Sequence, residues 1–335
     1  MAAQRWSCLI LLLQALGAAS TGSAQPENIR LLYYPPWNIS KLPLYVAREM
    51  GIFEKHGLEI SWTNPGSNNK LLAAMKNGAV DIAIVSSNHV VQNNASGGPP
   101  MIVVGNTGYN YSVFLVDAAI KRPEDLKGKK IGSGEAGSTP DQLTRLALRK
   151  LGLDPDRDVA LTHFEDARST DRAKALTSGQ ITGSMVTAEA IYELEKSGRI
   201  KDFRILADHK RLNIYAGGGA DYAVATAFLK NRRPEAKSFM AAICEGIAVA
   251  RQNKSKALEI MTNAERNREA ALMEYLYRLY ITEVIPARPH PKLAGVELGI
   301  EMQAPTLPAA RGLKASELVD ASLVHELEKE GRCNF

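Results

Sequence analysis

The sequence has few of the residues from which catalytic and metal sites are usually built. It has three cysteines and six histidines among 335 residues. The histidines are scattered along the chain: His56, His89, His163, His209, His290 and His325. No two of them have the spacing that places metal ligands on one helical turn or across a hairpin. No Gly-x-Ser-x-Gly motif occurs either. The sequence therefore gives no positive sign of a metal site or of nucleophilic hydrolysis.

Long apolar runs are absent beyond the N-terminus, where no stretch approaches the roughly 18 apolar residues of a spanning helix. The N-terminus has the order of a secretory signal: one positive charge in Met1–Arg5, apolar residues over Trp6–Ala19, and a cleavage-like end at Gly22–Ala24. We therefore expect residues 1–24 to be a removable signal peptide. The mature chain is then a soluble protein of the periplasm of a Gram-negative bacterium.

The charge is mildly basic, with 41 Lys and Arg against 36 Asp and Glu, and the two signs are interleaved. Aromatic residues do not alternate with basic clusters, so nucleic acid is not an expected partner. Cys244 and Cys333 lie beyond the signal. An oxidising compartment permits a disulfide between them, and one buried thiol with one terminal thiol is the alternative.

Short β-rich runs alternate with helical periodicity, a pattern that predicts an α/β fold. The first unit consists of a strand Ile29–Tyr34, a helix Leu42–Lys55, a strand Leu58–Trp62, a helix from its cap Ser67 to Lys76, and a strand Val80–Val85. The second consists of a strand Lys129–Gly132, a helix from its cap Thr139 to Leu151, a strand Val159–Phe164 and a helix Ala173–Ser178. We interpret these units as two similar lobes.

Two further extended runs, Ser112–Val116 and Asp221–Thr226, indicate that the chain crosses between the lobes twice. Lobe 1 would then consist of residues 25–116 and 221–335, with lobe 2 over residues 117–220. Paired linkers of this kind allow hinge closure around a ligand. In the tail, the pattern predicts helices over 234–268 and 316–329, and the proline-rich stretch 286–308 predicts an extended wrap.

Ligands of open α/β sheets bind beyond the carboxyl ends of the strands. The loops at these ends carry hydroxyl, amide, acidic and aromatic side chains. Our candidate ligand-binding residues are Tyr34, Trp37, Asn38, Ser67, Ser86, Ser87, Tyr109, Ser138, Thr139, Thr187, Glu189 and Asp221. Helix starts can bind an anion or simply cap themselves, and both interpretations stay open. Thr139 is the expected cap of its helix, with Gln142 completing a capping box.

The run Gly132–Gly137 has the spacing of a dinucleotide fingerprint. Its helix, however, begins only near Pro140, and the acid expected at the end of a second strand is not clearly placed. We therefore expect no cofactor.

A family resemblance rests on four sequence segments that occur in this order: Leu44–Leu58, Gly78–Ala83, Asp125–Gly132 and Val319–Gly331. With them the sequence resembles the substrate-binding proteins of bacterial ABC importers for nitrate, alkanesulfonates, taurine and thiamine-pyrimidine precursors. The resemblance implies the two-lobed type II periplasmic binding fold, an open mixed sheet in each lobe and a ligand in the cleft between them. Thr182 stands where similar proteins often carry an acid.

The resemblance also implies a function. A monomeric receptor would capture a small organic anion, such as a sulfonate, nitrate, taurine-like or aromatic acid, by hinge closure and deliver it to an importer permease in the inner membrane. One alternative is an enzyme of the same fold, similar to thiamine-pyrimidine synthases or menaquinone-pathway lyases, although the cysteine-rich motif of the fungal synthases is absent. Another is a receptor that reports to a sensor kinase.

Overall fold

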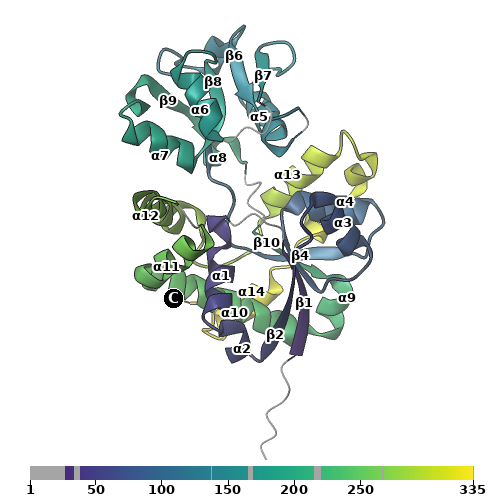
Figure 1. The fold of residues 1–335 in the computed structure, drawn as a ribbon. Coiled ribbons are helices and arrows are strands. Elements are labelled where there is room, and N and C mark those ends of the chain that lie inside the picture. Colours follow the sequence, from purple (N-terminus) through teal and green to yellow (C-terminus); the bar gives the residue numbers. More distant parts are fainter. Residues whose placement is uncertain are drawn as a thin grey trace, which may run out of the picture.

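The computed structural model describes residues 27–33, 38–136, 138–164, 169–214, 220–265 and 268–334. The expected signal peptide and the candidates Tyr34 and Trp37 lie outside these residues. The described chain forms two lobes, each built on a five-stranded sheet flanked by helices (Figure 1). The strand orders are β2-β1-β3-β10-β4 and β7-β6-β8-β5-β9. The α/β two-lobed fold expected from the sequence is confirmed.

Lobe 1 is made from two separate parts of the chain. The first contributes β1 (Glu27–Tyr33), η1 (Ile39–Lys41), α1 (Leu42–Glu49), α2 (Ile52–Lys55), β2 (Leu58–Thr63), α3 (Asn68–Lys76), β3 (Ile82–Val85), α4 (Ser87–Ala95) and β4 (Met101–Asn106). The second contributes β10 (Asp221–Ala225), α9 (Thr226–Asn231), α10 (Arg233–Gln252), α11 (Lys254–Ala264), α12 (Ala270–Leu279), η4 (Tyr280–Val284), α13 (Leu293–Gln303), η5 (Pro308–Gly312), η6 (Ala315–Glu317) and α14 (Ser322–Lys329).

Lobe 2 is continuous in sequence. It contains β5 (Ser112–Asp117), η2 (Pro123–Leu126), β6 (Lys130–Ser133), α5 (Thr139–Lys150), β7 (Ala160–His163), α6 (Ser169–Thr177), β8 (Gly183–Thr187), α7 (Ala188–Lys196), η3 (Ile200–Asp202), β9 (Phe203–Asp208) and α8 (His209–Leu212). In both sheets one returning strand is antiparallel to its neighbours: β10 between β3 and β4, and β5 between β8 and β9.

The lobes are joined at different residues from those that the sequence indicated. Ser112–Val116 is not a linker, because it belongs to β5, which pairs with β8 and β9 inside the second sheet. The first crossing therefore falls at residues 107–111, between β4 and β5. A buried central strand and an extended linker have the same local pattern, so only the pairing distinguishes them.

Three other predicted elements need correction. The helix expected over Leu42–Lys55 is divided at Gly51, whose φ of +63° is left-handed and interrupts the helix. The extended wrap expected over 286–308 is wrong, because α13 occupies the proline-free segment Leu293–Gln303 between Pro291 and Pro305. The last helix begins at Ser322 rather than at Ser316.

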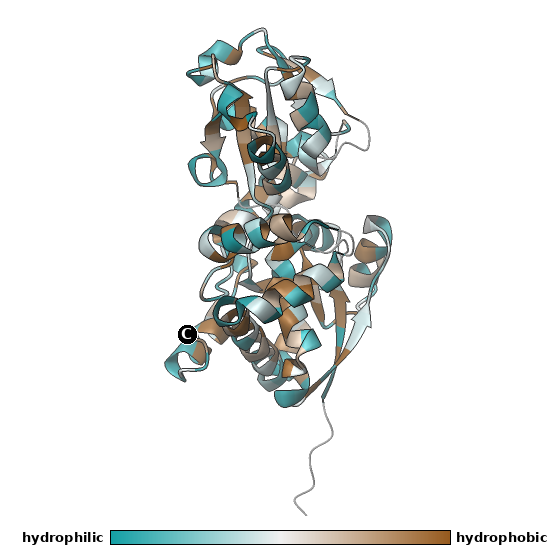
Figure 2. Ribbon diagram, turned by 60° about the vertical axis from the view of Figure 1, so that its left-hand side comes forward, coloured by the Kyte–Doolittle hydropathy of each residue, from teal (hydrophilic) through white to brown (hydrophobic). Residues whose placement is uncertain are grey.

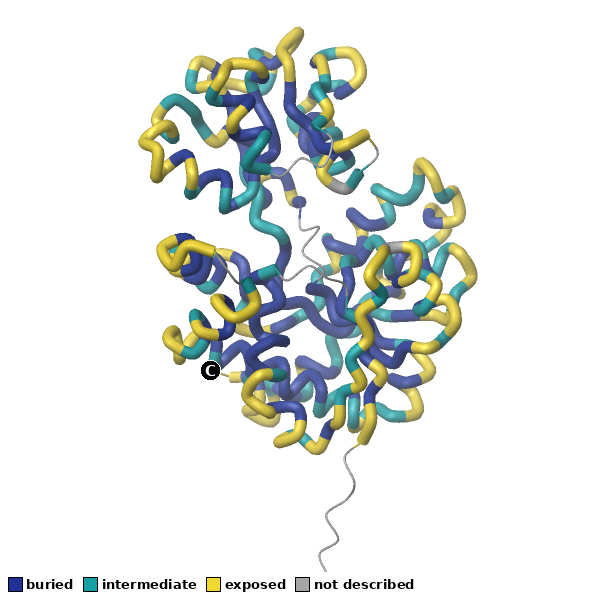
Figure 3. Tube along the Cα trace, in the orientation of Figure 1, coloured by how far each residue is buried: buried dark blue, intermediate teal, exposed yellow. Residues whose placement is uncertain are grey.

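Apolar side chains on both faces of each sheet form the cores. The strands and the inner faces of the helices hold most of the hydrophobic residues (Figure 2), and the same segments are buried (Figure 3). No helix in the described ranges combines the length and the apolar character needed to span a membrane.

The C-terminal segment is fastened to lobe 1 at several points. Val319 forms a parallel bridge with Val103 of β4. A disulfide joins Cys333, just after α14, to Cys244 of α10, with the two Cα atoms 5.2 Å apart. Of the two alternatives that the sequence left open for these cysteines, the structure has the disulfide.

Helix α10 packs closely under α1 because Gly246 has no side chain. A Cβ atom added at Gly246 would lie 2.3 Å from the carbonyl oxygen of Pro43. We expect Gly246→Ala to lower the free energy of unfolding by about 1–3 kcal/mol, the usual cost of overpacking a core. Urea unfolding of the purified protein measures this change.

Gly312→Ala is the matched control, since no atom lies within 4 Å of its added Cβ. Its unfolding free energy should stay within about 0.5 kcal/mol of the parent protein. Equal stabilities of the two variants would contradict the close packing of α10 on α1.

Candidate functional site

The carboxyl ends of β1, β3 and β4 and the first residue of β10 meet at one edge of the first sheet. Asp221 pairs with Val85 of β3 on one side and with Asn106 of β4 on the other. Ser86 and Ser87 come directly after β3, and the crossover to lobe 2 leaves from Asn106. This is the edge at which ligands of open sheets bind.

Asp221 lies at the centre of a buried polar network at this edge. The hydroxyl of Ser87 donates to Asp221 Oδ2 at 2.6 Å, and the amide Nδ2 of Asn106 donates to Asp221 Oδ1 at 2.7 Å. Asn106 also accepts a hydrogen bond from the N–H of Gly108, at 2.9 Å. Burial raises the pKa of Asp221, although these hydrogen bonds act in the opposite direction. Ser87 and Asp221 therefore contact each other, and through Asn106 they position the first residues of the crossover.

The loop after β3 is covered from outside. Ser86 donates its N–H to Nδ1 of His89 at 3.3 Å and so begins α4. Burial lowers the pKa of His89 to about 4. Gly299 of α13 lies directly against Asn88, since a Cβ added there would be 3.1 Å from the Asn88 nitrogen. Helix α13 thus forms a wall over this part of the edge.

Ser67 and Asn38 both cap helical turns. Ser67 is exposed and accepts from the N–H of Lys70 at 3.4 Å, as the sequence predicted for a cap. Asn38 accepts from the N–H of Ser40 at 2.8 Å and begins η1. Unlike Ser67, Asn38 also lines the cavity described below.

In lobe 2 the start of α5 differs from the prediction by one residue. Ser138, not Thr139, caps the helix and accepts from the N–H of Asp141 at 3.4 Å; Thr139 is the first helical residue. The N3 position is therefore Asp141 rather than Gln142, so the predicted capping box does not form. Asp141 is buried and accepts from Ser133 and from Nε of Arg145, at 2.7 and 3.1 Å. Arg145 thus offsets the negative charge near this helix start.

Thr187 is the last residue of β8, and Glu189 follows it in α7 at the same edge of lobe 2. The N–H of Thr187 donates to the hydroxyl of Ser169, which begins α6, at 2.7 Å. Thr187 makes no side-chain cap of its own helix. Glu189 is half-buried in the first turn of α7 and faces lobe 1 across the cavity.

A cavity lies between the lobes and is lined from both of them and from the crossover. It is partly open to solvent. Its lining residues are Asn38, Ile39, Asn110, Glu189, Met261, Glu265, Arg268, Met273, Leu276 and Tyr280. Two predicted residues, Asn38 and Glu189, are therefore brought together here. The apolar part, from α11 and α12, was not expected from the sequence.

Tyr109 lies at the hinge between the lobes. It is buried, its hydroxyl is hydrogen-bonded to Nε2 of His209 in lobe 2, and it donates to the carbonyl of Glu283 in lobe 1 at 3.1 Å. The rings of Tyr109 and His209 have centroids 4.4 Å apart. Burial lowers the pKa of His209 to about 4, so its imidazole is neutral at physiological pH.

Three buried or half-buried cations near the two sheet edges were missed by sequence reasoning. Lys41 ends η1, and burial lowers its pKa to about 8. Arg172 lies in the first turn of α6, is 4% exposed, and donates to the carbonyl of Met185. Lys292 precedes α13, close enough to Asp221 for their charges to interact. Lys41 and Arg172 each stand in the first helical turns that follow a strand, β1 and β7, and this was the available signal. Lys292 follows no strand end and gave no such signal.

The pKa of Asp221 leads to a test of the network. Because its pKa is raised in the folded protein, its protonated form is favoured by folding. The stability that it contributes is therefore fully present below the unfolded pKa of about 4 and is lost as the pH rises from there through its folded pKa. We expect the difference in unfolding free energy between the parent protein and Asp221→Asn to shrink over that range, as measured by urea unfolding.

Asp81→Asn is the matched control with the opposite sign. Burial by itself would raise the pKa of Asp81, but hydrogen bonds from Arg30, at 2.6 Å for the shortest, outweigh it and lower the pKa. The corresponding difference for Asp81→Asn should grow as the pH rises to about 4. If the difference in unfolding free energy changed with pH in the same direction for both variants, the pKa of Asp221 would not be raised in the folded protein.

Comparisons with known proteins agree with this architecture. A family model described as NMT1/THI5 like matches residues 38–257. The nitrate/nitrite binding protein NrtA of Nostoc is 26% identical over 44% of this chain and 38% of its own length. A 4-amino-5-hydroxymethyl-2-methylpyrimidine phosphate synthase of Schizosaccharomyces pombe is 28% identical over 43% and 40%. The chain thus spans less than half the length of these curated relatives.

The fold is shared with solved binding proteins. The periplasmic aliphatic sulphonate binding protein SsuA of Escherichia coli superimposes with a TM-score of 0.63 over 89% of this chain and 92% of that one, at 20% identity. The family model covers well over half of the 335 residues. The chain therefore belongs to the NMT1/THI5-like family and has the fold of periplasmic binding proteins.

Proposed function

We propose that this chain is the periplasmic solute-binding component of an ABC importer. The observation that carries the proposal is the cavity between the lobes, lined by Asn38 of lobe 1, Glu189 of lobe 2 and Asn110 of the crossover. A site shared by two lobes and their linker is suited to capture by closure, since a ligand contacts all three parts only when the lobes approach.

The proposed ligand is a small organic anion. Among the described residues that line the cavity, one is a cation, Arg268. Lys41 of lobe 1 and Arg172 of lobe 2 are buried cations outside that lining. Charge-assisted hydrogen bonds from such groups to an anion are strong. Met261, Met273 and Leu276 supply an apolar wall for a carbon skeleton. Glu189 places a negative charge in the same cavity, which suits a ligand whose acidic end is accompanied by a hydrogen-bond donor, as in a taurine-like solute.

Closure requires little free energy on the hinge side. Lys196 of lobe 2 pairs with Glu269 of lobe 1 at 2.6 Å, and Lys210 pairs with Glu283 at 2.8 Å. These groups are largely exposed, and solvent screens such ion pairs so that each contributes little. Ligand contacts can therefore decide between open and closed forms. The closed form would present both lobes to the permease.

An enzyme of the same fold is the second candidate, since a relative of this chain is named as a pyrimidine phosphate synthase. A receptor for a sensor kinase would use the same cavity and the same closure. The three functions differ in the step after binding, which is delivery to a permease, chemical change of the ligand, or signalling.

Thermal unfolding of the refolded mature protein against a panel of ligands tests the proposal. The panel contains taurine, alkanesulfonates, nitrate, aromatic carboxylates and pyrimidines, and refolding removes any ligand carried through purification. We expect one anionic class to raise the unfolding midpoint temperature in a concentration-dependent way. At a ligand concentration of 100 times Kd, the gain in unfolding free energy should be about 2.7 kcal/mol. If only pyrimidines raised the midpoint, and if the protein then changed them chemically, the result would favour an enzyme over a receptor.

Glu189→Gln tests whether the cavity is the binding site. A bare sulfonate should bind about fivefold more tightly to this variant, because about 1 kcal/mol of like-charge repulsion is removed. Taurine should bind more weakly, because its amine loses a charged partner. Isothermal titration calorimetry measures both affinities.

Glu193→Gln is the control, since this exposed acid lies one turn further along α7 and outside the cavity. It should leave both affinities unchanged. If Glu189→Gln bound both ligands with the affinities of the parent protein, Glu189 would not belong to the binding site.

A further inference from the structure

A second cluster of potential ligand atoms lies on lobe 1, away from the cavity between the lobes. His325 and Glu328 are three residues apart on α14 and so lie on one face of that helix. His290 lies in the segment between η4 and α13. One ring nitrogen from each histidine and one carboxylate oxygen of Glu328 all lie within 4.8 Å of one another.

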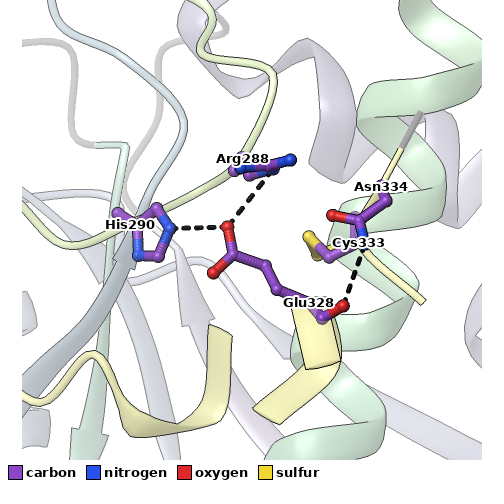
Figure 4. The surroundings of a disulfide bond; sticks show 6 residues. Arg288, His290, Glu328, Cys333 and Asn334 are labelled. Atoms are coloured by element: carbon purple, nitrogen blue, oxygen red, sulfur yellow. Dashed lines mark hydrogen bonds and ion pairs between the residues drawn. A yellow bond between two sulfur atoms is a disulfide. The ribbon is translucent and has the colours of Figure 1, made fainter. Parts of the chain in front are cut away.

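The spacing of these atoms is close to that of a tetrahedral metal site. His290 Nε2 is 2.9 Å from Glu328 Oε1, and the His290 and His325 rings have centroids 4.9 Å apart (Figure 4 shows the first pair). Nitrogen and oxygen ligands about 2.0–2.1 Å from a zinc ion are about 3.3 Å from each other in a tetrahedron. Side-chain movements of up to about 1.5 Å would therefore bring the three ligand atoms to this spacing.

Both elements that carry the cluster are held in place. Helix α14 is fastened by the Cys244–Cys333 disulfide and by Arg233, which contacts Glu326 at 2.5 Å. The segment with His290 is fixed to β4, because the N–H of Asn106 donates to the carbonyl of Pro289 at 3.0 Å. A site whose ligands are already positioned loses little conformational entropy on binding an ion.

We propose that His290, His325 and Glu328 bind a divalent transition-metal ion of the zinc class. Two imidazoles and one carboxylate favour such an ion over Mg²⁺ or Ca²⁺, which prefer oxygen ligands. Three protein ligands leave a fourth position for water. Cys244 and Cys333 are joined in the disulfide, so neither supplies a thiolate that competes for the ion.

The ion would connect α14 to the segment that leads into Lys292 and α13. Helix α13 covers the start of α4, where Gly299 lies against Asn88. A metal ion would thus fasten one wall of the edge that carries Asp221. This role does not depend on which solute the cavity between the lobes binds.

Arg288 competes with the ion for the same oxygen. Its Nε lies 3.2 Å from Glu328 Oε1, the atom that also contacts His290 (Figure 4). An ion bound through this oxygen would therefore compete with Arg288 for it. Removing the arginine charge should strengthen metal binding, whereas a cluster that only forms hydrogen bonds has no reason to respond in this way.

Calorimetric titration of ZnCl2 into the untagged, EDTA-dialysed protein, with its disulfide intact, tests the proposal. We expect one zinc ion per chain and no heat of binding with MgCl2. His325→Asn should weaken zinc binding at least tenfold. Because His325 is exposed, the variant should unfold at the parent midpoint in EDTA. Arg288→Gln should bind zinc several-fold more tightly.

His56→Asn is the control. His56 Nε2 contacts Glu245 at 3.0 Å, which repeats the histidine–carboxylate pair without a second histidine. This variant should bind zinc as the parent protein does. The proposal is overturned if the parent protein binds no zinc at 100 times the protein concentration, or if His325→Asn binds it with unchanged affinity.

Discussion

The position of β10 is the constraint on which the rest of the molecule depends. This strand enters the first sheet between β3 and β4 only after the chain has passed through lobe 2. Its first residue, Asp221, is buried, and a buried carboxylate is costly unless it is hydrogen-bonded. Ser87 and Asn106 supply those bonds. The side chain of Asp221 therefore fixes the relative positions of β10, the start of α4 and the first crossing. The shape of the cavity between the lobes depends on these positions.

Elements with strong local signals could be predicted from the sequence. The strands over Leu58–Trp62 and Val80–Val85 and the Ser67 cap were found, because alternation, apolar runs and capping residues act over a few positions. The assignments that failed depended on contacts with residues far away in the sequence. Ser112–Val116 is extended in either interpretation, and only its pairing with β8 and β9 makes it a central strand. In α13, flanking prolines concealed a helix that packs against α4.

The candidate site shows the same limit at the level of side chains. Strand ends correctly indicated where polar residues gather, but not where each side chain points. Ser87 donates a hydrogen bond to Asp221, 134 positions away, while Asn38 and Glu189 line the same cavity from different lobes. His290 and His325 were set aside because their spacing fits neither a helix nor a hairpin, yet the fold brings their rings together. Spacing finds sites on one element and misses those assembled from several.

The discontinuity of lobe 1 also bears on the order in which the protein can fold. Residues 112–212 contain every strand of the second sheet, so lobe 2 can form while later residues are still being made. The first sheet lacks β10, the strand between β3 and β4, until residue 225 is available, and the disulfide of lobe 1 cannot form before Cys333 is made. Until then β3 and β4 expose apolar edges that would pair with other chains. Lobe 1 is accordingly the part of the molecule most in need of protection during synthesis.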